Sequence, residues 1–277
     1  IEDADKYGDD RRSLIVARGA AQALTATALI SNEPLTIILS EKGWIRAAKG
    51  HDSDVKSLNY RSGDAYLDSV LGRTTQPVFV FDSKGRVYTT STHDLPSARS
   101  QGEPLTGRLK PAAGVFFTHL LAGREEEWLL LSSDAGYGFR VQVKDLISKN
   151  KAGKALVTLP ADVKLLTPVK IANTTDFIAV ATLQGRLLIF PVSALPALTK
   201  GKGNKLIQIP TADLTAQTDK VVSVAVVAEG KALKIDAGKR TLTMKPADME
   251  SYLGVRAKRG GHLPRGFQRV DAMKGAE

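Results

Sequence analysis

The sequence predicts an all-β fold in which five repeated hairpin blades form a propeller-like array behind a short N-terminal helical segment. Five segments share one pattern: an apolar run, a short turn with glycine, and a second strand-like run. They are PLTIILSEKGWIRAA, PVFVFDSKGRVYTT, WLLLSSDAGYGFRVQ, FIAVATLQGRLLIFP and ALKIDAGKRTLTMKP. Their turn glycines recur at intervals of 42, 51, 49 and 53 residues, at Gly43, Gly85, Gly136, Gly185 and Gly238. A repeat of about 40–50 residues cannot bury its own faces, so this period indicates blades stacked radially.

Each repeat begins as two strands joined by a tight turn, in which glycine supplies the positive φ that other residues resist. In copies two to five a second element follows: a Leu or Met, often Leu-Pro, then a basic loop with glycine, then another short strand. The four segments are HDLPSARSQGEPLTGRLKP, KDLISKNKAGKALVTLP, SALPALTKGKGNKLIQIP and ADMESYLGVRAKRGGHLPRG. Copy one instead has a long insertion that starts at Lys49 and contains no Leu-Pro.

The start of the chain differs from the repeats. Residues 1–13 are polar and predicted helical, and residues 14–32 form an Ala-rich connection. We therefore expect two parts, residues 1–32 and a repeat domain at 33–277. The charged opening and the absence of an initiator Met suggest a fragment of a longer protein without a signal peptide.

Composition limits the function classes. The 277 residues are 43% hydrophobic, enough for a buried core, and no run of about 18 apolar residues predicts a membrane span. The absence of cysteine excludes disulfides, thiolate metal sites and thiol catalysis, and is compatible with a cytoplasmic location. A net charge of +10 and a pI near 9.7 favour a polyanionic partner, although a solvated basic surface is the alternative.

Signs of an independent enzyme are weak. The four histidines have no metal-ligand spacing, and there is no P-loop motif. Lys200–Lys205 superficially resembles a phosphate cradle, but its place in a repeated loop favours a turn that contacts DNA phosphate. We expect Trp44 and Trp128 to pack between blades rather than stack on bases. We predict no catalytic residue, no metal site and no cofactor in this chain.

The basic residues are the candidate binding site, because lysine and arginine neutralise phosphates without reading sequence. They recur in two places, and ordinary surface charge is the alternative for each. One set follows the hairpin turns: Arg46, Lys49, Arg86, Arg140, Arg186, Lys239 and Arg240. The other lies in the loops after the hairpins: Arg99, Arg108, Lys149, Lys151, Lys154, Lys200, Lys202, Lys205, Arg256, Lys258, Arg259 and Arg265. A recurrent position on a radial array predicts a track along the rim for bent duplex.

The repeat resembles the C-terminal β-pinwheel domain of the A subunits of gyrase and topoisomerase IV, over almost the whole chain. Phe81–Tyr88 and Leu95–Arg99 are similar to both types of protein. Ser132–Phe139 and Lys200–Lys205 are similar to topoisomerase IV, and Lys6–Arg12 looks like the segment that leaves the family's catalytic core. The resemblance implies an open, broken pinwheel of five blades, where gyrase usually has six.

One departure separates this chain from gyrase members. Gyrase carries a box of paired arginines and a glycine run in its first blade, which wraps DNA in a chiral loop. The corresponding residues 49–64 lack the paired arginines and include Asp52, Asp54 and Asp64. This difference predicts bending and guiding of DNA without strong chiral wrapping. Lys258–Gly261 is the nearest approach to such a box.

The resemblance also implies a role. The domain would be a non-catalytic, nucleoid-associated, monomeric DNA-binding part of an ATP-dependent type II topoisomerase, guiding the choice of crossings. The nucleophilic tyrosine, Mg²⁺ and ATP sites would lie in other domains, and the partners would be duplex DNA, the catalytic core and the ATPase B subunit. The alternative is a propeller adaptor whose basic rim binds an acidic partner such as a condensin.

Overall fold

The computed structural model describes residues 2–8 and 31–276, and the chain divides into two units, Ile1–Ile30 and Ser31–Glu277. The first unit contains the helix α1 (Glu2–Tyr7), with three acids in its first turn and Lys6 in its last, as the helix dipole favours. This helix confirms part of the predicted helical segment. The rest of the predicted connection, residues 9–30, lies outside the described residues.

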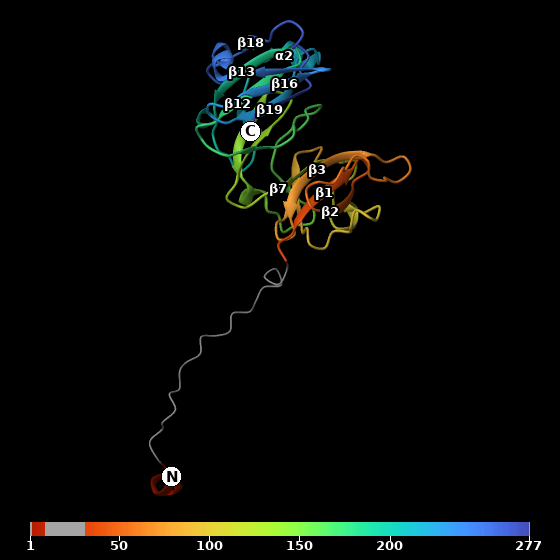
Figure 1. Ribbon diagram of the computed structural model, residues 1–277, viewed down its shortest axis with the longest axis vertical. Coiled ribbons are helices and arrows are strands. Elements are labelled where there is room, and N and C mark those ends of the chain that lie inside the picture. Colours follow the sequence, from red (N-terminus) through yellow and green to blue (C-terminus); the bar gives the residue numbers. More distant parts are fainter. Residues whose placement is uncertain (1, 9–30, 277) are drawn as a thin grey trace. The chain divides into compact units, whose positions relative to one another are not determined.

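The second unit contains the five predicted hairpins (Figure 1). They are β1 (Pro34–Ser40) with β2 (Trp44–Lys49), β4 (Val78–Asp82) with β5 (Arg86–Thr90), β8 (Trp128–Ser132) with β9 (Tyr137–Gln142), β12 (Phe177–Thr182) with β13 (Arg186–Pro191), and β16 (Leu233–Ala237) with β17 (Arg240–Met244). The five turn glycines all have positive φ, between 62° and 81°. The predicted turns are therefore confirmed, together with the reason for glycine.

A third strand joins each hairpin on the side of its first strand. These strands are β3 (Tyr66–Arg73), β7 (Phe117–Ala122), β11 (Val169–Ile171), β15 (Val221–Val227) and β19 (Ala272–Gly275). Strand β3 packs against β7, β11 against β15, and β15 against β19. The third strands thus form the inner edges of the blades, where neighbouring blades meet.

The fourth strand of a blade comes from the following repeat. These short strands are β6 (Glu103–Pro104) beside β2, β10 (Lys154–Ala155) beside β5, β14 (Asn204–Lys205) beside β9, and β18 (Gly261–His262) beside β13. They occupy the edge opposite the third strand, so they form the outer rim of blades 1 to 4. Among the described residues the fifth blade has three strands, β17-β16-β19.

This exchange explains the exception in copy one. A Leu-Pro loop and its short strand serve the blade before, and within the described residues copy one has no blade before it. Its hairpin therefore continues through residues 50–65 directly into the third strand, β3. Short helical turns complete the unit: η2 (Leu105–Gly107), η3 (Val143–Leu146), η4 (Val192–Ala194), α2 (Thr211–Thr215), α3 (Pro246–Met249) and η5 (Glu250–Tyr252).

The core lies between blades. Along β4, Val78 and Val80 pack into the cluster shared with blade 1, while Phe79 and Phe81 pack into the cluster shared with blade 3. Side chains alternate across a strand, so a strand buried on both faces can contribute to two cores. Two further clusters join blades 3 with 4 and 4 with 5. In the part of the chain that the structure describes, none of the four clusters joins blade 5 to blade 1, so the pinwheel is open.

Candidate nucleic-acid interface

Four equivalent loops cross the outer rim, and we call them the outer loops: residues 97–102, 148–153, 198–203 and 255–260. Each ends in a glycine immediately before the exchanged fourth strand: Gly102, Gly153, Gly203 and Gly260. These glycines have φ between 66° and 86°. The matched placement shows that the basic segments seen in the sequence are one structural element, repeated on four blades.

The closing glycines are fixed by close approach as well as by φ. An added Cβ would lie 2.5 Å from the Gly138 carbonyl oxygen at Gly203, and 2.6 Å from the Leu187 oxygen at Gly260. Gly102 and Gly153 meet the Ile45 and Val87 oxygens in the same way, at 2.6 and 2.8 Å. Each contacted residue lies two positions after its turn glycine, so the loops cross the blades in one register. The sequence showed that these loops contain glycine. The signal that could have identified the closing positions is that a glycine recurs directly before each short strand.

The Leu-Pro element fastens the start of an outer loop. The Ala47 amide donates to the Pro96 carbonyl (2.9 Å), and the Ala98 amide donates back to Ala47 (2.8 Å). On the third blade the Arg140 amide donates to Pro196 (3.1 Å), and the Leu198 amide returns to Arg140 (2.9 Å). Proline fixes φ and has no amide hydrogen of its own, so it suits a segment held through its carbonyl. The element therefore anchors the loop on the preceding blade.

Cations of the outer loops are exposed and unopposed by acids within the loops. The loops contain no Asp or Glu, and seven of their cations are exposed: Arg99, Lys149, Lys151, Lys200, Lys202, Lys258 and Arg259. The eighth, Arg256, is half-buried and donates to the Ala194 and Lys205 carbonyls at 3.0 and 2.6 Å. Lys202 Nζ lies 4.0 Å from the centre of the Tyr137 ring, which holds this lysine over the end of β9.

The arginines of the hairpin set point differently from what the sequence suggested. Arg46 is only 3% exposed, stacks on Tyr60 and donates to the Asn59 and Ser100 carbonyls at 3.0 and 2.9 Å. Arg86, Arg140 and Arg186 are half-buried, and each donates to a backbone carbonyl of the following repeat. Guanidinium groups committed to backbone carbonyls are poorly placed to meet a phosphate.

The remaining candidates fall into three groups. Arg108 is paired with Asp94 and Glu103, which compete with any phosphate. Lys154 and Lys205 are half-buried in the exchanged strands. Exposed positions outside the outer loops are Lys49, Lys239, Arg240 and Arg265, and Lys49 Nζ lies 3.7 Å from a Glu33 oxygen. Of the eleven candidates that are exposed, seven lie in the outer loops, and direct contact with DNA stays a prediction for each residue.

The insertion of copy one is built around aromatic–cation contacts. The Arg61 guanidinium lies 4.1 Å from the Trp44 ring centre, and the Arg46 guanidinium lies 4.6 Å from that of Tyr60, whose pKa is raised by burial. Asp64 accepts bonds from the Ser40 hydroxyl (2.6 Å) and the Lys42 amide (2.9 Å), which fixes the first hairpin turn. Trp128, in contrast, packs against the core between blades 3 and 4, as predicted.

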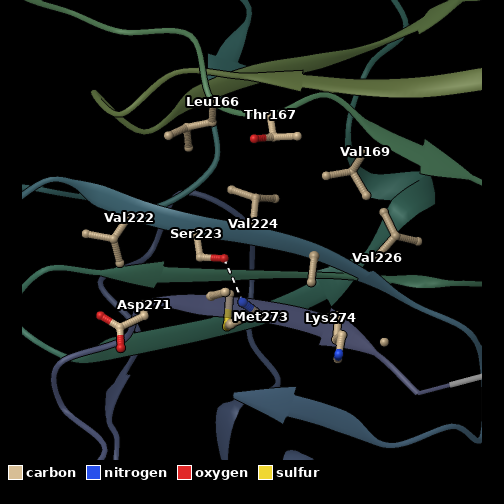
Figure 2. Close-up of a pocket in the computed structure, with 13 residues that line it drawn as sticks. Leu166, Thr167, Val169, Val222, Ser223, Val224, Val226, Asp271, Met273 and Lys274 are labelled. Carbon is tan, nitrogen blue, oxygen red and sulfur yellow. Dashed lines mark hydrogen bonds between the residues drawn. The ribbon is translucent and has the colours of Figure 1, made fainter. Parts of the chain in front are cut away.

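A pocket of about 400 Å³ lies at the inner edges of β11, β15 and β19 (Figure 2). Its walls are largely aliphatic, including Leu166, Val169 and Val224, and the Ser223 hydroxyl accepts a bond from the Met273 amide at 2.9 Å. Asp271 in its rim accepts the Gly238 amide of the last hairpin turn. Ser223 and Asp271 thus support the fold, and none of the described residues that line this pocket forms a nucleophile–base pair.

Two findings concern only residues 2–8 and 31–276. No group of three or more His, Asp or Glu side chains there could hold a metal ion. No helix in that part of the chain is long and apolar enough to cross a membrane.

Comparisons with known proteins agree with this architecture. The family model "DNA gyrase C-terminal domain, beta-propeller" matches residues 77–113, 127–171 and 176–228. The A subunit of DNA topoisomerase 4 from Pseudomonas aeruginosa is 49% identical over 274 residues, covering 99% of this chain and 36% of that protein. Its counterpart from Escherichia coli K12 is 44% identical over 272 residues, covering 98% and 36%. The chain therefore spans about a third of the length of these relatives.

Solved structures extend the match to three dimensions. The E. coli ParC C-terminal domain superposes with a TM-score of 0.77 at 45% identity, covering 87% of this chain and 98% of that one. A DNA gyrase A C-terminal domain shares the fold at 15% identity, with a TM-score of 0.62 and coverage of 86% of this chain and 81% of that one. The chain belongs to the family of C-terminal β-pinwheel domains found in the A subunits of topoisomerase IV.

Proposed function

We propose that this domain binds duplex DNA along its outer rim and bends it, and thereby guides which DNA crossings the full enzyme selects. One observation carries the proposal: four outer loops in one register, with seven exposed cations and no acid. Exposed lysine and arginine displace counterions from the phosphate backbone, which gives affinity without sequence preference. A track repeated from blade to blade suits a curved duplex better than a short straight one.

The distribution of charge supports bending rather than strong wrapping. Blade 1 carries one exposed outer-loop cation, Arg99, whereas blades 2, 3 and 4 carry two each. In the neighbouring insertion, residues 49–64, three acids, Asp52, Asp54 and Asp64, offset the three cations Lys49, Lys56 and Arg61. The first blade is therefore the weakest attachment point on the rim. DNA held mainly by blades 2 to 4 is guided along part of the rim, without the first-blade anchor that a chiral wrap requires.

The wider assignment rests on the relatives. The domain would act within an ATP-dependent type II topoisomerase during strand passage, decatenation and relaxation, at the nucleoid in the cytoplasm. The catalytic core of the same polypeptide would supply the tyrosine and bind Mg²⁺, and the B subunit would bind ATP. We expect the isolated domain to be a monomer and its own residues to bind no cofactor.

Fluorescence anisotropy of a labelled duplex of about 40 base pairs, titrated with the domain at several salt concentrations, tests the binding role. We expect affinity that is independent of sequence and falls steeply as salt rises. Absence of binding even at low salt would overturn the proposal and favour an acidic protein partner, such as a condensin, on the same loops.

A second experiment tests the role in the assembled enzyme. Neutralising the outer-loop lysines should reduce decatenation by the assembled enzyme. Unchanged decatenation would show that DNA binding by this rim does not guide strand passage.

A further inference from the structure

Two arginines occupy the same position in different blades and make the same contact. Arg86 and Arg186 each follow the turn glycine of their hairpin directly. Arg86 Nη2 donates to the Gly153 carbonyl at 2.8 Å and its Nε to the Ala152 carbonyl at 3.1 Å. Arg186 Nη1 donates to the Gly260 carbonyl at 3.1 Å. Each arginine therefore holds the closing glycine of the outer loop that the next repeat lays across its blade.

We propose that Arg86 and Arg186 are positioning residues, which set the outer loops in the shape that binds DNA and do not touch DNA themselves. This inference rests on the proposed function. Both side chains are half-buried, and Nε of Arg186 is buried without a partner among the described residues. Arg86 donates in two directions at once, and the flexible, strongly hydrated lysine ammonium cannot reproduce that fork.

The held carbonyls are adjacent to the cations that would bind phosphate. Gly260 follows Lys258 and Arg259 directly, and Gly153 closes the loop of Lys149 and Lys151. The closing glycine lies close against the backbone of the hairpin's second strand. A guanidinium bond to the carbonyl of that glycine therefore fixes the orientation of the last peptide of the loop. Losing that bond should displace both loop cations together, although neither is altered chemically.

In the third blade a different contact holds the outer loop. Its residue after the turn glycine is Tyr137, whose ring lies 4.0 Å from Lys202 Nζ and 5.9 Å from Lys205 Nζ. Here the hairpin holds a loop cation directly, where blades 2 and 4 hold the loop backbone. Arg140 instead holds the Leu-Pro element just before this outer loop, since its Nε donates to the Leu195 carbonyl at 2.5 Å. The position after the turn glycine thus contacts the outer loop in all three blades.

The test compares Arg86→Lys, Arg86→Gln and the control Arg269→Gln, which removes one exposed arginine outside the outer loops. The readouts are the salt dependence of DNA affinity and the thermal unfolding midpoint. A positioning role predicts that both Arg86 variants lose the contacts of Lys149 and Lys151, so that the slope of log K against log salt falls by up to about 1.8. The control should keep the wild-type slope.

Other results would overturn the inference. A direct phosphate contact predicts that Arg86→Lys binds like wild type and that Arg86→Gln lowers the slope by about 0.9. A merely structural role predicts a lower unfolding midpoint with unchanged affinity of the folded protein. If the Arg86 variants do not fold, Arg186→Gln tests the same role on the fourth blade, where Lys258 and Arg259 should lose their contacts. Failure of the wild-type domain to bind DNA would instead reject the proposed function.

Discussion

Removing two cations from one outer loop offers a quantitative test of the rim. The double variant Lys200→Gln, Lys202→Gln neutralises both exposed lysines of loop 198–203 and leaves Gly201 and Gly203 in place. The backbone bond from the Leu198 amide to Arg140 is unaffected. Apart from charge, the loss is the contact of Lys202 with the Tyr137 ring, worth about 0.5–1 kcal/mol at an exposed site. The fold should therefore survive.

The magnitude follows from the seven exposed outer-loop cations. Each phosphate neutralised contributes about 0.9 to the slope of log K against log salt, so the ceiling for binding through the outer loops alone is about −6. A fourfold rise in salt, from about 50 to 200 mM, then weakens binding by on the order of 10³–10⁴. The double variant retains five cations, which lowers the slope to about −4.5 and the same weakening to roughly 500-fold.

Fluorescence anisotropy with one labelled duplex measures both slopes under identical conditions. The matched control is Lys84→Gln, Lys231→Gln, which removes the same charge from two exposed lysines outside the outer loops. We expect the control to keep the wild-type slope. If the control lowers the slope as much as the loop variant, the duplex senses net charge and not the outer loops. A wild-type slope in the loop variant would refute the assignment of this loop.

Three further outcomes test the fold that presents the rim. Gly203→Ala places a Cβ 2.5 Å from the Gly138 oxygen at φ 82°, so chemical denaturation should show that the free energy of unfolding falls by at least about 1–2 kcal/mol. The control Gly107→Ala has nothing within 4 Å of the new Cβ and should leave stability nearly unchanged. Equal denaturation midpoints for the two variants would contradict the close approach as the reason for glycine. Phe139 is 0% exposed in the core between blades 2 and 3, so Phe139→Ala leaves a cavity and the free energy of unfolding should fall by about 3–5 kcal/mol. A loss below about 1 kcal/mol would show that this core is not tightly packed. Burial acts to raise the pKa of Glu127, but hydrogen bonds from Lys170 and Arg124 outweigh burial and leave that pKa below its ordinary value near 4.5. The ionised carboxylate therefore stabilises the fold above that pH, and its contribution is lost as the pH falls through the lowered pKa. Glu127→Gln should flatten the acid side of the plot of stability against pH, and an unchanged plot would reject this link between ionisation and folding.

The hairpins could be predicted from sequence because their determinants are local. An apolar run, a glycine at positive φ and a second apolar run fix each hairpin without reference to the rest of the chain. The period then gave the number of blades, and the repeated Leu-Pro and basic segments indicated a further short strand. All of these depend on residues within one repeat.

The partner of the short strand could not be predicted in the same way. Strand β10 has two residues, Lys154 and Ala155, and nothing in them distinguishes pairing with their own hairpin from pairing with β5 of the blade before. That choice depends on where the loop can travel once the blades are stacked. The roles of Arg86 and Arg186 depend on the same choice, since a cation after a turn looks exposed until a neighbouring loop covers it.

Strand exchange therefore divides one recurrent sequence position into two roles. In blades 2 and 4 the residue after the turn glycine is covered by the following repeat, so Arg86 and Arg186 donate to its backbone. In blade 5 no described segment crosses the outer edge of β17, and the corresponding Lys239 and the adjacent Arg240 are exposed. Of the cations near the hairpin turns, these two are therefore better placed to meet phosphate than the arginines in the covered blades. The rim that the structure supports combines four outer loops with one uncovered hairpin turn, a pattern set by strand exchange and not by the recurrence of basic residues alone.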